Sequence, residues 1–320
     1  MPQHFLDRFS FSIFQFAQEQ KLIDPTDKIL VSVSGGVDSV CLLIVLNAFR
    51  IKIDLELHLV HFHHGLRAES DEEADFVKDL GSSLALPVTI RKTSELKGSR
   101  GMQNKARIWR FQQLESLMAE LNANKIALGH HLDDLVETQL WRLMRGCSLF
   151  SLNPIQVRHL PYIRPLLHTP KSALVDYLNS IGQPWREDDS NQTTDYTRNL
   201  IRHKIIPIMD ECAGGKLSEK LLGIDTDARH LREHFDECVP ASCYEQTELD
   251  YHTVSSLNPL LGHELIHRFL IFHEQEEVTR AHIKKIYGLI LSGKGNWTVN
   301  LKEGISVRGD KKKVKLIKLP

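Results

Sequence analysis

The residues best suited to chemistry in this sequence form a glycine-rich run that lies between two apolar segments. Residues 28–33 alternate as a strand does, and residues 40–48 form the long apolar stretch of a buried helix. Glycines in such a turn let consecutive backbone N–H groups converge, and the N-terminus of the following helix adds roughly half a positive charge. The pattern predicts an anion site made of Ser34, Gly35, Gly36, Val37, Asp38 and Ser39.

The run is not a Walker A loop, which would need a lysine before its final serine or threonine. Asp38 is informative because a carboxylate among phosphate-binding N–H groups would repel a phosphate unless it contacts a metal or a hydroxyl. Magnesium ligation explains this residue better than packing does. The alternative is a tight strand-to-helix turn with Ser39 as its cap.

A second chemical group begins at His130 and continues into a helix-like segment. Its apolar positions recur at helical spacing and predict a buried stripe of Leu132, Leu135, Val136, Leu140 and Leu143. Five other positions lie off that stripe: Asp133, Asp134, Glu137, Thr138 and Trp141. Carboxylates beside a triphosphate would hold Mg²⁺, so Asp38 and Asp134 are the predicted ligands. The alternative is acidic residues favoured by the dipole at a helix N-terminus.

Two further groups could contact a nucleotide. His61, His63 and His64 follow a predicted strand and indicate a binding loop, with zinc as the alternative ligand. Arg107 and Arg110 lie on one helical face and either neutralise phosphate charge or form a solvated surface. We expect His61 and Arg107 to belong to the nucleotide site.

The elements that position these residues alternate along the chain. Residues 1–20 are expected to form an amphipathic helix, and four strand-like runs, each separated from the next by a helical segment, cover 28–33, 55–62, 87–92 and 125–129. This order predicts an α/β fold with a doubly wound parallel sheet of about five strands. In such sheets ligands bind beyond the carboxyl ends of the strands, where the glycine-rich run lies.

The second half of the chain differs in character. Helices are expected near 254–272 and 278–292, followed by strands at 297–301, 305–308 and 314–318. Thr169-Pro170 predicts a helix start and Gly182 its stop. The glycines at 214 and 215 suggest a hinge, so we expect a catalytic domain with a helical extension over 1–215 and a small α+β domain over 216–320.

The composition of the chain restricts its partners and its location, although less strongly than the motifs do. The 40 basic and 41 acidic residues nearly cancel, giving a net charge of −1, so a nucleic-acid partner would need a locally basic face. The five cysteines form no Cys-x-x-Cys pair, and no secretory signal precedes the first strand. No stretch approaches the ~20 apolar residues of a membrane span. We expect a cytoplasmic protein with no membrane contact.

The glycine-rich run resembles the pyrophosphate-binding loop of the PP-loop ATP pyrophosphatases. Further motifs make the sequence similar to the bacterial tRNA(Ile)-lysidine synthetase family over about residues 28–210. They include His-x-x-His-Gly-Leu-Arg at 61–67, Asn-Lys-Ala-Arg-x-x-Arg-Phe at 104–111, Arg-Pro-Leu-Leu at 164–167, Trp-x-Glu-Asp at 185–188 and Arg-Asn-x-Ile-Arg at 198–202. The sequence departs from the family's usual residues at three positions: His63 stands where an acidic residue is usual, which puts any role of that position in doubt, while Leu135 replaces a glutamine and Gly129 an alanine. The last two changes remove no carboxylate.

The resemblance implies an ATP-dependent ligase with an adenine nucleotide alpha hydrolase-like fold. ATP and Mg²⁺ would adenylate the wobble cytidine of a CAU-anticodon isoleucine tRNA, and free L-lysine would displace AMP to form lysidine. The residues expected to catalyse or to bind lysine are His131, Asp133, Asp134, Glu137 and Arg107, with Glu137 or His131 as the base. The residues expected to contact tRNA are Arg198, Arg202 and Lys204, beside His203. A lysine-rich tail at 311–318 is a second basic candidate, and a homodimer is one option for assembly.

Three other functions compete with this one. A tRNA 2-thiolation enzyme of the same superfamily would need paired, reachable cysteines. A small-molecule adenylating ligase would not need the basic cluster around Arg202 or an additional domain. A nucleotide sensor without catalysis would have little use for Asp133, Asp134 and Glu137 together.

Overall fold

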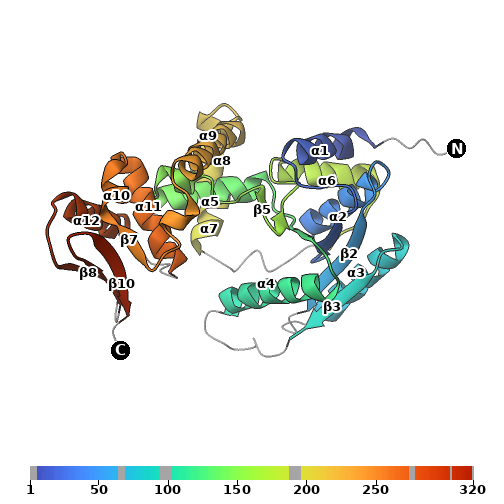
Figure 1. Cartoon of the computed structure of the whole chain (residues 1–320). Coiled ribbons are helices and arrows are strands. Elements are labelled where there is room, and N and C mark those ends of the chain that lie inside the picture. The colour runs from blue at the N-terminus through green and yellow to red at the C-terminus, as the bar shows by residue number, and fades with distance from the viewer. Residues whose placement is uncertain are drawn as a thin grey trace. The chain divides into compact units, whose positions relative to one another are not determined.

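The computed structural model describes residues 6–63, 69–93, 102–186, 196–273, 278–302 and 305–318. The chain divides into two compact units, drawn in Figure 1. The first comprises the chain up to Thr138 together with Ile155–Ser218, and the second comprises Gln139–Pro154 together with Glu219–Pro320. The segment 139–154 therefore groups with the C-terminal part, and the domain boundary near residue 215 stays a prediction.

The first unit is built on a six-stranded sheet in the order β3-β2-β1-β4-β6-β5. Neighbouring strands from β3 to β6 are parallel, and only β5 runs antiparallel to its neighbour β6. The strand bounds are β1 Lys28–Ser32, β2 Glu56–His63, β3 Val88–Lys92, β4 Lys125–Ala127, β5 Arg158–His159 and β6 Tyr162–Ile163. The predicted doubly wound parallel sheet is confirmed. The two-residue strands β5 and β6 escaped prediction because they are too short to show alternation.

Both faces of this sheet are covered, as β1 shows. Leu30 is buried on the face where α4 (Met102–Glu120) places Leu114 and Leu117. Ile29 and Val31 alternate with Leu30 and are also fully buried, on the opposite face, where α2 (Val37–Phe49) follows β1. Right-handed crossovers on a parallel sheet produce this arrangement.

The remaining helices up to residue 212 lie in the first unit, except that α5 continues from it into the second. Their bounds are α1 Arg8–Glu19, α3 Glu69–Ser83, α5 Leu132–Met144, α6 Lys171–Ser180, α7 Tyr196–Leu200, a π-helical turn Ile201–Ile205 and α8 Ile206–Cys212. α6 stops where predicted, because Gly182 adopts φ +66° just beyond it. The predicted stripe of α5 holds through Leu140, but Leu143 is 45% exposed because the helix ends one residue later, before a turn at Gly146.

The second unit carries an antiparallel sheet in the order β7-β10-β9-β8 and a group of helices. The predicted helix over 254–272 is wrong as a single element. Pro259 cannot continue a helix, and the Asn258 side chain accepts the Leu261 N–H at 3.0 Å to start a new one. The bounds are a 3-10 turn Leu149–Leu152, α9 Leu217–Cys238, a 3-10 turn Ala241–Cys243, β7 Glu248–Asp250, α10 Tyr251–Ser256, α11 Pro259–Phe272, α12 Arg280–Leu291, β8 Trp297–Lys302, β9 Ile305–Gly309 and β10 Lys313–Lys318.

A separate hydrophobic core holds the second unit together. Phe235 of α9, Phe269 of α11, Ile286 of α12 and Val307 of β9 are fully buried in one cluster. Across the described residues, we find no helix with the length and apolar character needed to cross a membrane. The predicted small α+β unit with three strands near the C-terminus is confirmed.

One buried acid makes the stability of the second unit depend on pH. Asp225 is 2% exposed, and burial raises its pKa to about 6 although Asn153 Nδ2 donates to its Oδ1 at 2.9 Å. Because the native state binds this proton more tightly than the unfolded chain, stability falls as the pH rises from about 4 to 6. We expect the free energy of unfolding of Asp225→Asn to decrease by about 2–3 kcal/mol less than that of the wild type over this pH range.

Urea unfolding of both proteins at pH 4.5 and pH 7 measures this difference. The wild type should lose more stability than Asp225→Asn between the two pH values. Identical pH dependence in the two proteins would contradict the burial argument.

Candidate active site

The glycine-rich run forms the turn between β1 and α2. Gly35 has φ +98°, a conformation that favours glycine, and Gly36 is the residue that precedes the first turn of α2. Ser39 ties the turn together, since its Oγ accepts the Ser34 N–H at 3.1 Å and donates to the Gly36 carbonyl at 3.0 Å. The Gly35 carbonyl accepts the backbone N–H of Arg186 at 2.9 Å. The loop is therefore fixed from within and by a distant segment, which suits a preformed anion site.

The loop that follows β4 approaches the start of α2 closely. A Cβ on Gly129 would lie 3.1 Å from the backbone carbonyl carbon and oxygen of Asp38. Because Gly129 has none, the two loops at the carboxyl edge of the sheet can meet. The consequence is that Asp38 and the residues after Gly129 share one site.

His131 is the residue around which the carboxylates gather. Its Nε2 lies 3.5 Å from Asp38 Oδ1 and 3.6 Å from Asp134 Oδ2, and its Nδ1 lies 3.4 Å from Asp133 Oδ2. Asp134 Oδ2 also accepts the backbone N–H of His131 at 3.1 Å, and Asp133 Oδ2 accepts the backbone N–H of Lys171 at 2.8 Å. The predicted set Asp38, His131, Asp133 and Asp134 thus lies together.

The charges of this group follow from its burial. Burial alone would lower the pKa of His131, but the carboxylates of Asp133, Asp38 and Asp134 raise it to about 10. Burial raises the pKa of Asp134, against the effect of His131. At neutral pH His131 is therefore an imidazolium that lies among carboxylates, and it holds no free lone pair with which to accept a proton.

The donor set fits a magnesium ion. Asp38 Oδ1 is buried without a hydrogen-bond partner in the described structure, and the nearest oxygens of Asp38 and Asp134 converge on the same atom of His131. Among the described residues, no group of three or more histidine, cysteine, aspartate or glutamate side chains could hold a metal alone. Mg²⁺ is commonly bound by one or two carboxylates that are completed by substrate phosphates and water, so two carboxylates beside an anion loop suffice.

Cationic side chains gather next to this group. Arg164 Nε donates to His130 Nδ1 at 3.2 Å, and its Nη1 donates to the Gln156 carbonyl at 2.7 Å. Burial, followed by the charges of Arg164, Arg110 and Arg107, lowers the pKa of His130 to about 3, so the ring stays neutral. Arg107 and Arg110 therefore belong to a positively charged cluster at the site, as expected for residues that meet phosphate or carboxylate groups.

His61 lies behind the loop at the end of β2. Its Nδ1 donates to the Val33 carbonyl at 2.9 Å, the side chain is 2% exposed, and burial lowers its pKa. Its Nε2 has no partner among the described residues. His61 therefore fixes the backbone at Val33, directly before the anion loop. A direct contact between His61 and ATP stays a prediction.

Glu137 is paired with a residue that sequence analysis assigned to a different role. Arg202 donates through Nε and Nη2 to its two carboxylate oxygens at 2.5 and 3.0 Å, and the Glu137 side chain is 7% exposed. Arg202 lies in the π-helical turn, while Arg198 and Lys204 are exposed on either side of it. The predicted catalytic and tRNA-binding groups thus meet at this ion pair.

Lys171 is the site residue that sequence analysis missed. Besides its backbone bond to Asp133, its Nζ lies 3.8 Å from Asp38 Oδ2. The sequence signal was its position at the start of α6, directly after Thr169-Pro170. Of the motifs named above, residues 64–67 and 187–188 lie outside the described residues.

Comparison with known proteins identifies the family. Residues 8–209 match the PP-loop domain family. The tRNA(Ile)-lysidine synthase of Chlorobaculum tepidum is 34% identical over 222 residues, which are 68% of this chain and 67% of that protein. The enzyme of the same name from Thermosipho africanus is 37% identical over 201 residues, or 62% of this chain and 47% of that protein. The chain thus spans between about half and two thirds of the length of these relatives.

A solved structure supports the fold alone. The U34-tRNA thiolase NcsA from Methanococcus maripaludis superposes with a TM-score of 0.60 at 15% identity, covering 71% of this chain and 80% of that one. The glycine-rich loop, the converging carboxylates and the matched sequences lead to one assignment. The chain belongs to the tRNA(Ile)-lysidine synthase family of PP-loop ATP-dependent ligases.

Proposed function

We propose that this protein ligates free L-lysine to C2 of the wobble cytidine in CAU-anticodon isoleucine tRNA. The cytosine O2 attacks the α-phosphorus of ATP and pyrophosphate leaves, giving an adenylated cytidine. The ε-amine of lysine then attacks C2, loses a proton, and AMP leaves with the O2 oxygen. The product is lysidine.

The observation that carries the proposal is the placement of Asp38 and Asp134 at the mouth of the anion loop. Both carboxylates converge on His131 Nε2, next to backbone N–H groups at the start of α2. Asp38 and Asp134 would hold Mg²⁺, which when bound neutralises the charge of the departing pyrophosphate. The loop N–H groups add fixed donors to the same leaving group.

For the second step we infer that neither predicted base, His131 or Glu137, accepts the proton, because each is already paired with an opposite charge. His131 is already protonated, and Glu137 is held by two hydrogen bonds from Arg202. We assign Glu137 to positioning Arg202, and Asp133 to orienting His131 and Lys171.

The positive cluster of Arg107, Arg110 and Arg164 suits the anionic groups of ATP or of lysine, whose α-carboxylate needs a cation. Arg198 and Lys204 are exposed beside the Glu137–Arg202 pair and would contact tRNA phosphates. The proposal includes a cytoplasmic location, where tRNA and ATP are available. It leaves a homodimer as the assembly to be tested by light scattering.

Labelled lysine measures the reaction directly. We expect incorporation into a CAU-anticodon isoleucine tRNA transcript with ATP and Mg²⁺, and none into the CAU-anticodon methionine tRNA. Pyrophosphate release without lysine incorporation would show that the second substrate is wrong. No pyrophosphate release with any tRNA would favour a small-molecule ligase or a nucleotide sensor.

The thiolation alternative has less support. Cys41 is fully buried, and burial raises its thiol pKa to about 12, so this thiol is not a nucleophile. In the first unit the other cysteine is Cys212, which is exposed on α8. A thiolase would require reachable cysteines at the anion loop, and the residues described around that loop offer carboxylates and cations instead.

A further inference from the structure

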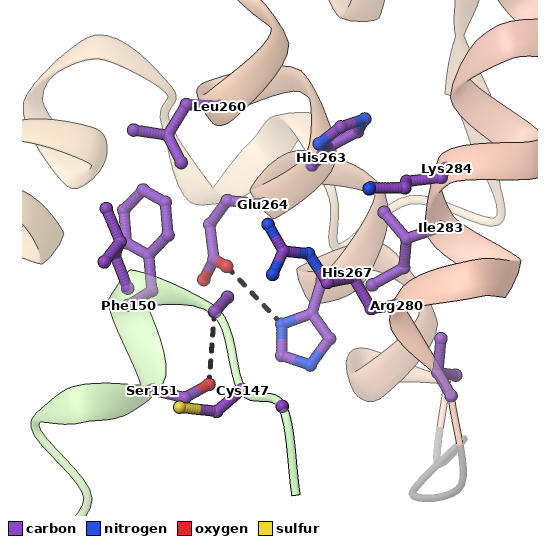
Figure 2. Close-up of a pocket in the computed structure, with 14 residues that line it drawn as sticks. Cys147, Phe150, Ser151, Leu260, His263, Glu264, His267, Arg280, Ile283 and Lys284 are labelled. Atoms are coloured by element: carbon purple, nitrogen blue, oxygen red, sulfur yellow. Dashed lines mark hydrogen bonds and ion pairs between the residues drawn. The ribbon is translucent and has the colours of Figure 1, made fainter. Parts of the chain in front are cut away.

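The second unit contains a cavity of about 230 Å³ that the proposed reaction does not use. It lies between the loop 146–151 and the helices α11 and α12, as Figure 2 shows. All of its walls belong to the second unit. This volume has room for a single ring with one attached charged group, and is smaller than a typical drug-sized site of ~300–1,000 Å³.

One wall of the cavity is positively charged. Arg280 and Lys284 lie one turn apart on α12, and His263 of α11 lies in the same lining. In the described structure neither the Arg280 guanidinium nor the Lys284 ammonium has a hydrogen bond or ion pair. Burial, followed by the charges of Lys284 and Arg280, lowers the pKa of His263. Both side chains are exposed, so these two cations face solvent and can be reached by a ligand.

The acid in the lining does not supply that counter-charge. Glu264 is 6% exposed, and its Oε1 accepts from Arg268 Nε at 3.1 Å. Its Oε2 lies 3.5 Å from His267 Nδ1, the contact drawn in Figure 2. Both carboxylate oxygens are therefore already engaged, one by the Arg268 guanidinium and one by the His267 ring. An anionic ligand would therefore find Arg280 and Lys284 as its partners.

The opposite wall is apolar and held in place. Leu149 and Phe150 face the cavity from the loop and Leu260 faces it from α11. The loop is anchored because Arg142 Nη1 donates to the Ser151 carbonyl at 2.9 Å and Arg232 Nη2 donates to the Phe150 carbonyl at 2.8 Å. A cavity that is rigid, charged on one side and apolar on the other binds a ligand with the same two halves.

We propose that this cavity binds the phosphate of one nucleotide, with the phosphate on Arg280 and Lys284 and the base or sugar against Leu149 and Leu260. Arginine and lysine are the common partners of phosphate, and a planar base suits an apolar wall. The nucleotide is either a free monophosphate or one residue of an RNA chain. The inference holds whether or not the lysine ligase activity does, because it uses other residues.

Histidine NMR on the full chain tests the proposal, with the His263 ring signal identified by its loss in His263→Gln. We expect uridine 5′-monophosphate to shift that signal saturably, whereas uridine, which lacks the phosphate, does not. Arg280→Gln/Lys284→Gln should weaken the binding about 10-fold or more, since charged hydrogen bonds are the strong ones. The control Lys285→Gln/Lys294→Gln removes the same charge outside the cavity and should bind normally.

Competition with tRNA distinguishes the two sources of the bound nucleotide. Displacement of the monophosphate by a tRNA transcript identifies an RNA residue as the natural occupant, and simultaneous binding identifies a free nucleotide. An unshifted His263 signal, or an equal loss of affinity in the control, would overturn the proposal. Unchanged signals from the histidines other than His263, in the absence of nucleotide, verify that both double variants are folded.

Discussion

Asp38→Asn is expected to slow ATP-dependent pyrophosphate release by about 1,000-fold, because it removes charge at the place where phosphate charge is neutralised. Asp38 Oδ1 is buried without a hydrogen-bond partner in the described structure and faces His131, while Oδ2 lies 3.8 Å from Lys171 Nζ. An amide of the same shape keeps the packing but cannot bind a cation strongly. Rates measured under tRNA and ATP saturation isolate this effect.

The matched control is Asp176→Asn, which makes the same chemical change on an exposed position of α6. It should retain the wild-type rate and the wild-type unfolding midpoint. An Asp38→Asn rate within about threefold of the wild type would show that Asp38 is a structural cap and not a metal ligand. High Mg²⁺ should restore part of the lost rate if the residue binds that ion.

Lys125→Met is expected to destabilise the first unit by about 3–5 kcal/mol, which is a large part of the stability of an ordinary domain. Lys125 is 5% exposed, and its Nζ donates to Asp27 at 2.6 Å and to Asp24 at 2.8 Å. Asp27 is itself 4% exposed. Methionine fills the same volume but leaves the Asp27 carboxylate buried without its cation.

A second substitution tests that reason. Asp27→Asn removes the buried carboxylate charge that Lys125→Met leaves without a cation. The double variant Lys125→Met/Asp27→Asn should therefore recover most of the lost stability. Asn124 Nδ2 donates to Asp27 Oδ1 at 2.7 Å, a bond that an amide oxygen can still accept. Urea unfolding of the four proteins gives the coupling energy. A double variant no more stable than Lys125→Met would contradict the ion-pair argument.

This ion pair also shows where sequence reasoning fails. Lys125 begins a strand-like run, and its charge gave no sign that it would be buried. Its partner Asp27 lies 98 positions away in sequence, and only the pairing of β1 with β4 brings the two together. The same is true of Glu137 and Arg202, which are 65 positions apart and were assigned to separate tasks.

The predictions that succeeded rest on local rules. Gly35 adopts the positive φ that a glycine-rich anion loop requires, and Gly182 ends α6 as expected. The order of strands and helices followed from apolar runs that are long enough to show a period. Pro259 is an exception. The rule that proline starts a helix and does not continue one could have been applied to the sequence, but a single helix was predicted across this residue.

The edges of the six-stranded sheet have a consequence for self-association. β5 is only two residues long and both are exposed, so it offers an approaching chain few unpaired backbone groups. At the opposite edge β3 ends in Arg91 and Lys92, which pair with Glu120 and Asp71. A short strand at one edge and charged side chains at the other disfavour cross-chain strand addition, the first step of amyloid-like aggregation.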